Sequence, residues 1–501
     1  MSGSIFKHIS LLIGSQLGQK IVGFFALIYY ARILTVEQLA VIPLFAIISE
    51  LSIVLFGFGI QAYVFKELPL KLEHETESAV GIIKKSLMIS FYAGGAMALI
   101  IYATVINVDE FLGMKNFTAN ELYYFLIGVV FECVTIMQQR ILAAVTMFKT
   151  LSLIGIIKSV IRPIMLITLY YYNGITGFMF GIMISSIMNY GVTRYALRKY
   201  LNKKISYKSI TAGAIFVNSW PYFLESLVMF MRRQGDQILV SSILGTGMLG
   251  VYFVAKRYAD LAWVIVTATD TVITPFLSKK TKSSPSQFSE NFRDLFAVGI
   301  FVSVPMALAM AVMVPFYIFI MSYEKYSIAI VACVILVFRI IPDILRGVII
   351  GRSVFVWCDP KTRFKFTLLD TVILLPLMYF GAHLGGLAGV AVAPLLASMV
   401  SGFYGVLLLS KVTQIIMPIK LSFQVVLCAF FSGLLAILAT AFFADSMLSS
   451  VISLLVFVVS YLVLFINVVT FEEIEKLVQK IIPKYGAKLV RIMRIIKVKH
   501  V

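Results

Sequence analysis

The chain is a succession of long apolar segments separated by short polar breaks. A transmembrane helix needs about 20 mostly apolar residues, and fourteen segments of the sequence meet this requirement. We expect spans at residues 7–33, 36–64, 79–106, 119–141, 148–172, 174–196, 209–244, 247–278, 293–320, 325–351, 362–381, 385–409, 420–443 and 447–470. The pattern therefore predicts an all-α polytopic membrane protein with fourteen transmembrane helices.

The polar breaks divide these spans into four regions. A basic break, RYALRKYLNKKISYK, follows the sixth span. We predict an N-terminal six-helix lobe at residues 1–200, a second six-helix lobe at 201–410, two additional transmembrane helices at 411–470 and a tail at 471–501. The tail has apolar and basic positions at helical spacing, which is typical of an amphipathic helix on the anionic cytoplasmic leaflet. A partner-binding tail is the alternative.

Two pairs of segments repeat at nearly equal offsets. ARILTVEQLAV from Ala31 resembles SSILGTGMLGV from Ser241, which begins 210 positions later. Residues 149–186 match residues 361–398 at an offset of 212, with the identical positions Lys149/Lys361, Thr150/Thr362, Gly174/Gly386, Gly177/Gly389 and Ser186/Ser398. Duplicated halves with an even number of spans share their orientation, and proteins of this design place a central cavity between the halves.

The seventh predicted span, residues 209–244, is too long for one straight crossing. It contains Trp220-Pro221 and Gly235. Proline removes a backbone donor and clashes with the preceding turn. We therefore expect a bent or interrupted helix in this span.

The formal net charge of +19 is mostly a signal of topology. If the N-terminus is cytoplasmic, lysine and arginine gather in the loops after even-numbered spans and in the tail, whereas the opposite side receives Arg32, Lys115 and Lys325. This distribution satisfies the positive-inside rule along the whole chain. It predicts two cytoplasmic termini, contact with membrane lipids, and no nucleic-acid partner.

Several charged residues lie within the predicted spans and not in the loops or the tail. The free energy of inserting each of them at mid-membrane is at least about 2.5 kcal/mol. Lys158 and Arg162 are four residues apart and therefore share a helix face. The basic residues at this depth are Lys20, Lys158, Arg162, Arg232, Arg233, Lys256, Arg257, Arg339 and Arg346. The acidic ones are Glu50, Glu132, Glu225, Asp236, Asp260, Asp270, Asp343 and Asp370. Such faces are expected to line a cavity, where the charges meet a ligand or one another.

Two roles are open for these residues, a ligand site or internal salt bridges. Lys158 and Arg162 have no acid within four residues on their own helix, which favours a ligand role, while Arg346 and Asp370 are expected to reach the cytoplasmic interface. The candidate substrate-binding residues are Lys20, Lys158, Arg162, Arg232, Arg233, Lys256, Arg257 and Arg339. For ion coupling we expect Asp236 beside Arg232 and Arg233, with Glu50, Glu132 and Asp343 as further candidates.

Nothing in the sequence indicates enzymatic chemistry. The four cysteines are scattered and the four histidines have no metal-like spacing, so we expect no metal site and read the cysteines as small core residues. No GxxxxGK[ST] motif occurs. We predict a protein that is not an enzyme, has no cofactor, and draws on a proton or sodium gradient, the membrane potential or the substrate gradient.

Three stretches resemble the polysaccharide-export branch of the multidrug/oligosaccharidyl-lipid/polysaccharide transporter superfamily, which includes the O-antigen flippases. They are residues 18–67, residues 235–261 (GDQILVSSILGTGMLGVYFVAKRYADL) and residues 359–391. The resemblance implies two six-helix lobes around a central cavity, commonly with two extra C-terminal helices. It also implies that the pattern Asp236, Gly245, Gly250 and Tyr252 marks the start of the second half.

The same resemblance implies a flippase of the bacterial cytoplasmic membrane. Its substrate would be an undecaprenyl-diphosphate-linked oligosaccharide, moved from the cytoplasmic to the outer leaflet by alternating access, and other polysaccharide-assembly proteins would be possible partners. A cavity with Arg and Lys donors suits a diphosphate. The alternatives are a flippase for the peptidoglycan lipid precursor, a cation or drug antiporter, and a membrane polysaccharide polymerase or ligase.

Overall fold

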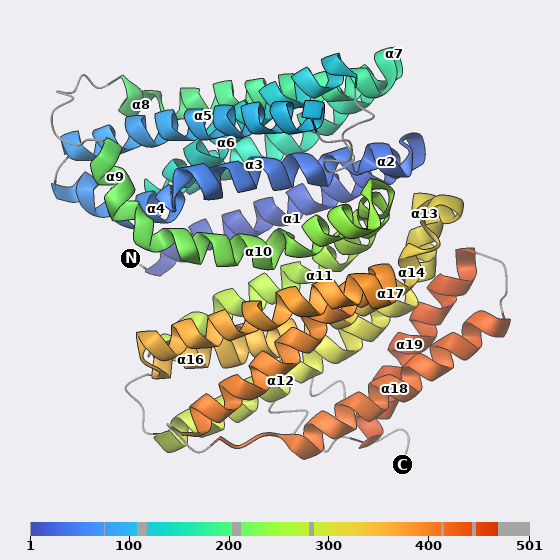
Figure 1. Ribbon diagram of the computed structural model, residues 1–501. Helices are drawn as coiled ribbons and strands as arrows, with labels where there is room; N and C mark the ends of the chain where they lie inside the picture. Colours follow the sequence, from blue (N-terminus) through green and yellow to red (C-terminus); the bar gives the residue numbers. More distant parts are fainter. Residues whose placement is uncertain are drawn as a thin grey trace. The chain divides into compact units, whose positions relative to one another are not determined.

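The computed structural model describes residues 2–74, 76–107, 118–202, 212–279, 285–411, 415–442 and 447–468. The chain divides into two compact units, Met1–Phe253 and Val254–Val501, and the described parts of both are helical (Figure 1). The predicted tail at 471–501 lies outside the described residues, and the predicted domain boundaries stay a prediction.

Two helices of unit 1, α2 and α6, begin with capping boxes that can be recognised in the sequence. Thr35 and Gln38 form reciprocal capping bonds before α2, and Thr118 and Glu121 do the same before α6. The helices of this unit are α1 (Ser2–Ile33), α2 (Val36–Leu39), α3 (Val41–Gly57), α4 (Ile60–His74), α5 (Thr76–Asn107), α6 (Ala119–Ala144), α7 (Phe148–Ala196), α8 (Arg198–Leu201), α9 (Ala212–Ser219), η2 (Trp220–Tyr222), α10 (Phe223–Leu239), η3 (Val240–Leu244) and the start of α11 (Thr246–Lys279).

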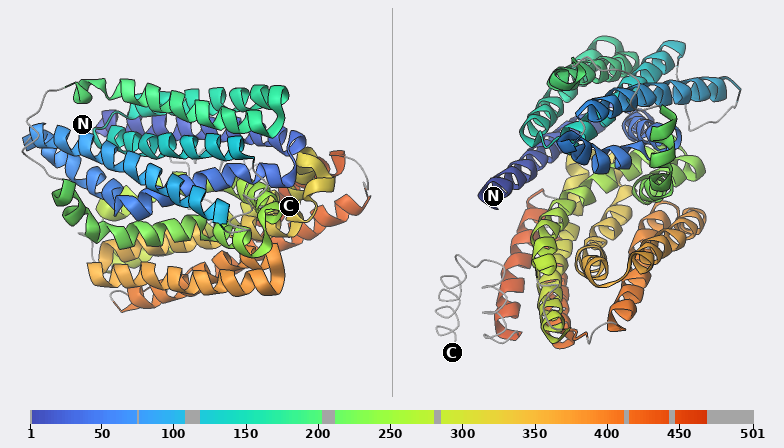
Figure 2. Two further views of the ribbon diagram at one scale, coloured as in Figure 1. Left: turned by 45° about the horizontal axis from the view of Figure 1, so that its top comes forward. Right: turned by 90° about the vertical axis from the view of Figure 1, so that its left-hand side faces the viewer.

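Apolar packing holds α4 to α7 together. Fully buried side chains from successive helices, among them Val64, Ile83 and Met137, form one cluster. Helices α5, α6 and α7 lie side by side in both views of Figure 2. Burial of apolar area stabilises this arrangement by about 25 cal/mol per Å² wherever water rather than lipid is excluded.

Unit 2 begins with the rest of α11, from Val254, and contains the helices that follow it. The C-terminal pair, α18 and α19, packs on α12 through a cluster that includes Val304, Cys428 and Phe465. The elements are α12 (Pro285–Val312), α13 (Val314–Tyr326), α14 (Ala329–Phe338), α15 (Ile340–Pro342), the π-helical segment η4 (Asp343–Ile350), α16 (Gly351–Trp357), α17 (Pro360–Ser410), α18 (Ile419–Phe442) and α19 (Met447–Val468). The four cysteines are unpaired and buried, as their apolar surroundings predict.

The predicted spans are confirmed by the helices. Each of the fourteen falls on a helix or a run of helices within the described residues. Nine stretches of the described chain are individually long and apolar enough to cross a membrane, and α7 with 49 residues is more than twice the length that one crossing needs. A reversal inside α7 divides it into two spans.

Helices α7 and α17 each contain a reversal of chain direction, and the two reversals have the same backbone conformation. Gly174 has φ 58° and ψ −139°, and Gly386 has φ 54° and ψ −133°. A Cβ at Gly177 would overlap the carbonyl oxygen of Leu169, and one at Gly389 would overlap that of Gly381. Both contacts join residues eight positions apart, which a continuous helix holds about 12 Å apart. The structure therefore confirms the repeat at an offset of 212.

The expected interruption of the seventh span lies at the Trp220-Pro221 step. There α9 ends, the three residues of η2 follow, and α10 begins at Phe223. Gly59, at the break between α3 and α4, has φ +77°, and a Cβ there would lie 2.7 Å from three backbone atoms of this interruption. Gly235 is buried inside the regular helix α10 and does not break it.

Candidate functional site

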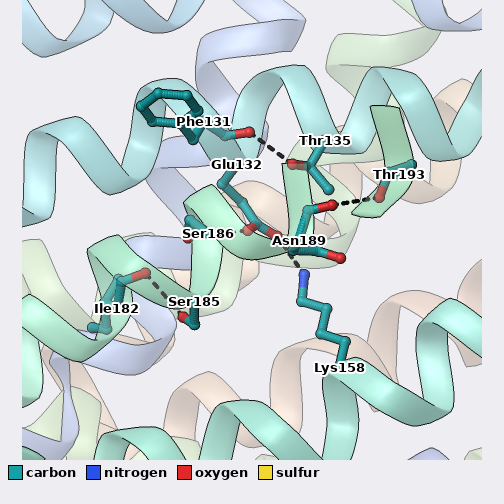
Figure 3. Close-up of polar contacts among 9 residues, drawn as sticks. All are labelled: Phe131, Glu132, Thr135, Lys158, Ile182, Ser185, Ser186, Asn189 and Thr193. Atoms are coloured by element: carbon teal, nitrogen blue, oxygen red, sulfur yellow. Dashed lines mark hydrogen bonds and ion pairs between the residues drawn. The ribbon is translucent and has the colours of Figure 1, made fainter. Parts of the chain in front are cut away.

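Lys158 and Glu132 form an ion pair inside unit 1 (Figure 3). The Nζ atom of Lys158, on the first arm of α7, lies 2.7 Å from Oε1 of Glu132 on α6. The Ser186 hydroxyl, on the second arm of α7, donates to the other carboxylate oxygen at 3.3 Å. The carboxylate thus connects α6 with both arms of the α7 hairpin. The sequence could not show this partner, because Glu132 lies on another helix.

Asn189 extends this polar cluster. It lies beside Glu132 and Lys158 in Figure 3, and its backbone carbonyl accepts a bond from Thr193. The residue is 6% exposed, and among the described residues its Nδ2 atom has no hydrogen-bond acceptor. A buried donor without an acceptor costs about 1 to 3 kcal/mol. Asn189 is not among the candidates predicted from the sequence, and its three-residue spacing from Ser186 is the signal that could have found it.

Arg162 and Lys20 lie on the two neighbouring helices α7 and α1. The Arg162 guanidinium lies 5.3 Å from the centre of the ring of Phe45 on α3, in a cation–π contact. It also attracts the Glu132 carboxylate electrostatically. Lys20 is half-buried on α1, directly after Gln19, whose side chain packs against Gly155 of α7. Lys20, Lys158 and Arg162 are therefore carried by helices in mutual contact.

A second polar cluster joins α3 to α10. Arg233 donates to Oε1 of Glu50 in an ion pair, and Nε2 of Gln234 donates to Oε2 of the same carboxylate at 3.0 Å. Gln237 then donates to Gln234 at 2.7 Å. Arg232 is half-buried on the same helix. The predicted residues Glu50 and Arg233 are thus brought together.

Asp236 is 2% exposed and lies one turn along α10 from Arg232. Its Oδ2 atom accepts a hydrogen bond of 3.1 Å from the hydroxyl of Tyr252 on α11. Its Oδ1 atom accepts one from the backbone N–H of Gln237. The carboxylate therefore links α10 to α11. Its role in ion coupling stays a prediction.

In unit 2, Arg339 and Asp343 form an ion pair between residues four positions apart. The Nε atom of Arg339 lies 3.1 Å from Oδ2 of Asp343. The same turn does not continue to Arg346, because residues 343–350 form the π-helical segment η4, whose wider turn changes the register.

The expectation that Arg346 and Asp370 reach the cytoplasmic interface is wrong. The Nη2 atom of Arg346 lies 3.3 Å from Oδ2 of Asp370, and the two side chains are 5% and 2% exposed. Ser401 donates to the other oxygen of Asp370 at 2.6 Å, and the guanidinium packs 4.8 Å from the centre of the Phe366 ring. The two charges are paired with each other inside the protein, and neither side chain extends to water.

The remaining predicted cations lie on α11. Lys256 and Asp260 are half-buried and Arg257 is exposed. Nearby, the hydroxyl groups of Tyr258 and Tyr317 donate to backbone carbonyls and their rings stack 4.4 Å apart. Within the described residues no three His, Cys, Asp or Glu side chains converge as a metal site would require.

Comparison with known proteins gives one matching family and a set of similar structures. The model of the family described as "Polysaccharide biosynthesis protein" matches residues 5–280. The inward closed conformation of the lipid II flippase MurJ superposes with a TM-score of 0.66 at 16% identity, covering 91% of this chain and 97% of that one. The Vibrio cholerae MATE transporter VcmN in the bent form gives a TM-score of 0.54 at 14% identity, covering 82% and 97%.

An inward-facing multidrug resistance MATE transporter of the MOP superfamily gives a TM-score of 0.55 at 14% identity, covering 79% of this chain and 95% of that one. At these identities the structural likenesses establish the fold alone. A stretch of 70 residues is also 37% identical to the fluoride-specific ion channel FluC of Thermosipho africanus (strain TCF52B). The chain spans 56% of that channel's length, and the match covers 14% of this chain.

Proposed function

The chain belongs to the polysaccharide biosynthesis protein family, and from this premise we propose that it is a flippase for lipid-linked oligosaccharide. The substrate would be an undecaprenyl-diphosphate-linked sugar repeat unit of a surface polysaccharide such as O-antigen. It would pass from the cytoplasmic to the outer leaflet of the bacterial cytoplasmic membrane by alternating access. Both termini would face the cytoplasm, and other polysaccharide-assembly proteins would supply and consume the substrate.

The observation that carries this proposal is the cationic group of unit 1. Lys20, Lys158 and Arg162 are half-buried on the contacting helices α1 and α7. A diphosphate is costly to bring into hydrocarbon, and charge-assisted bonds from ammonium and guanidinium groups offset that cost. Arg232, Arg233, Lys256, Arg257 and Arg339 remain further candidates for contact with the substrate.

We propose that an ion gradient, the membrane potential or the substrate gradient drives the cycle, because the sequence has no nucleotide-binding motif. Asp236 and Glu50 both join α10 to a neighbouring helix, to α11 and α3 respectively. A change in their protonation or ion binding would therefore alter contacts between helices. Glu132 pairs with Lys158 and Asp343 pairs with Arg339, and both acids remain further candidates.

Deletion of the gene in its native host tests the proposal. A flippase predicts single lipid-linked repeat units that accumulate on the inner leaflet and are protected from a sugar oxidant added outside the cell. Single units on the outer leaflet would instead indicate a polymerase or ligase. Re-expression of the intact chain should clear the accumulated lipid.

A second candidate is a flippase for the peptidoglycan lipid precursor, which the superposition with the lipid II flippase MurJ favours. This precursor also carries a diphosphate, so the cationic group of unit 1 fits both substrates. Complementation of a strain depleted of its own lipid II flippase separates the two. Growth rescue supports the second candidate, and lysis with normal protein levels supports the first.

A further inference from the structure

Two ion pairs lie at similar places in the two halves of the repeat, and the hairpin helix carries opposite charges in them. Lys158 plus the offset of 212 gives position 370, which is an aspartate. Lys158 pairs with Glu132 from the span before it, and Asp370 pairs with Arg346 from the span before it. We call these the unit 1 pair and the unit 2 pair. The hairpin helix carries the cation in unit 1 and the anion in unit 2.

The surroundings of the two pairs are alike. In each unit a serine on the second arm of the hairpin donates to the carboxylate, Ser186 to Glu132 at 3.3 Å and Ser401 to Asp370 at 2.6 Å. Each pair therefore joins three helical segments, but the two serines are not equivalent, because at the offset of 212 Ser186 corresponds to Ser398 and Ser401 corresponds to Asn189. The hairpin thus differs at two positions of the cluster: Lys158 stands opposite Asp370, and Asn189 stands opposite Ser401.

The two pairs differ in enclosure. Lys158 and Glu132 are 24% and 11% exposed, whereas Arg346 and Asp370 are 5% and 2% exposed. The more accessible member of the unit 1 pair is the lysine side chain. The unit 2 pair is closed to any ligand, because Phe366 and the hairpin cover it.

Unit 1 also contains hydrogen-bond donors that its own carboxylate does not use. The Nδ2 atom of Asn189 is buried without an acceptor among the described residues. Arg162 lies one turn from Lys158 on the same arm and packs on Phe45 instead of forming an ion pair at bonding distance with Glu132. Phosphate oxygens accept bonds from such donors. The cluster therefore contains two cations, Lys158 and Arg162, and one carboxylate, Glu132.

We infer that unit 1 is the half that binds the diphosphate of the substrate. It does so because its cation lies on α7, at the accessible position of the pair. The unit 2 pair is a closed structural contact. The inference rests on the proposed function and specifies which side chains meet the diphosphate. Lys158 holds the anion with Arg162 and Asn189, and Glu132 is a positioning residue that orients Lys158.

Exchanging the charges of each pair tests this inference. In Glu132→Lys/Lys158→Glu the ion pair can re-form, but the accessible member becomes a carboxylate, which repels a diphosphate and can engage Arg162 four residues further along the helix. The matched control is Arg346→Asp/Asp370→Arg. Binding of farnesyl diphosphate to the purified full-length protein in detergent is measured by calorimetry, together with thermal stability.

We expect the unit 1 exchange to leave the melting temperature close to that of the wild type and to weaken farnesyl diphosphate binding by about tenfold or more, which corresponds to about 1.4 kcal/mol. The unit 2 exchange should bind like the wild type. If it fails to fold, Arg346→Met/Asp370→Leu replaces it as the control.

Unchanged binding in the unit 1 exchange overturns the inference, as does equal weakening in both exchanges or the absence of any binding by the wild type. A deletion strain without inner-leaflet accumulation, combined with binding that follows the charge exchange, would reject the proposed substrate but keep the diphosphate site. The two proposals can therefore fail separately.

Discussion

Replacing Gly250 with alanine is expected to force α2 and α11 apart and to abolish transport. A methyl group at this position would overlap the carbonyl oxygen of Val36 and lie 3.0 Å from its carbonyl carbon. Both atoms belong to the backbone of α2 and cannot rotate away. Any conformation of the transport cycle that needs this contact would be disfavoured, and a cycle stops when one of its states is lost.

Cysteine labelling measures the separation of these helices. Leu39 on α2 is fully buried, so Leu39→Cys should react slowly with a maleimide in the parent protein. The four native cysteines are buried and give little background. In the Gly250→Ala background we expect labelling to be about tenfold faster, which corresponds to a shift of about 1.4 kcal/mol in the equilibrium.

Gly247→Ala is the matched control for this experiment. Gly247 lies one turn earlier on the same helix, and a methyl group there would meet the Oε1 atom of Glu37 at 3.1 Å, at the end of a flexible side chain that can turn aside. Labelling and transport should stay near the parent values. Equal effects of both substitutions would show that the contact of Gly250 with Val36 has no special role.

Arg346→Met is expected to destabilise the protein by about 3 to 5 kcal/mol, because it leaves the Asp370 carboxylate buried without its counter-ion. Thermal unfolding in detergent, followed by size-exclusion chromatography of the heated samples, measures the loss. The double substitution Arg346→Met/Asp370→Leu removes both charges and should recover most of the stability, since an apolar replacement of a buried pair is often neutral.

Arg293→Gln provides the comparison at an exposed site. Arg293 lies 3.5 Å from Asp294, and the side chains are 44% and 29% exposed. Such pairs contribute about 0 to 1 kcal/mol, so the melting temperature should change little. A double substitution at 346 and 370 that is as unstable as the single one would mean that the charges themselves, rather than an unpaired carboxylate, hold α17 in place.

The sequence predicts the helices well because each span needs only local information. Hydrophobic length locates the spans, and Gly174 and Gly386 mark the two reversals because glycine readily adopts the positive φ that both require. The repeat could be recognised from such positions before any contact was known. What local patterns could not show is the interruption of α13 at Ser322, where φ is 140° in a residue that rarely adopts it.

The candidate site was predicted only in part, because its partners lie far apart in the sequence. The chain places Glu132 and Lys158 26 residues apart and Glu50 and Arg233 183 residues apart. Helical spacing finds Asp343 for Arg339, since both lie on one helical run. The position of Arg346 near the cytoplasmic end of its span suggested the interface, but its guanidinium pairs with Asp370 inside the protein.

The contact of Arg233 and Gln234 with Glu50 has a consequence for biogenesis. Helix α10 carries several charged and amide side chains, and each charge raises the cost of its insertion by about 2.5 to 3.5 kcal/mol at mid-membrane. When α10 leaves the ribosome, α3 has already been synthesised and can present its carboxylate to the arriving arginine. Helix α3 would thus help α10 to insert into the membrane. The substitution Glu50→Ala should reduce the membrane insertion of α10, while α3 itself inserts normally.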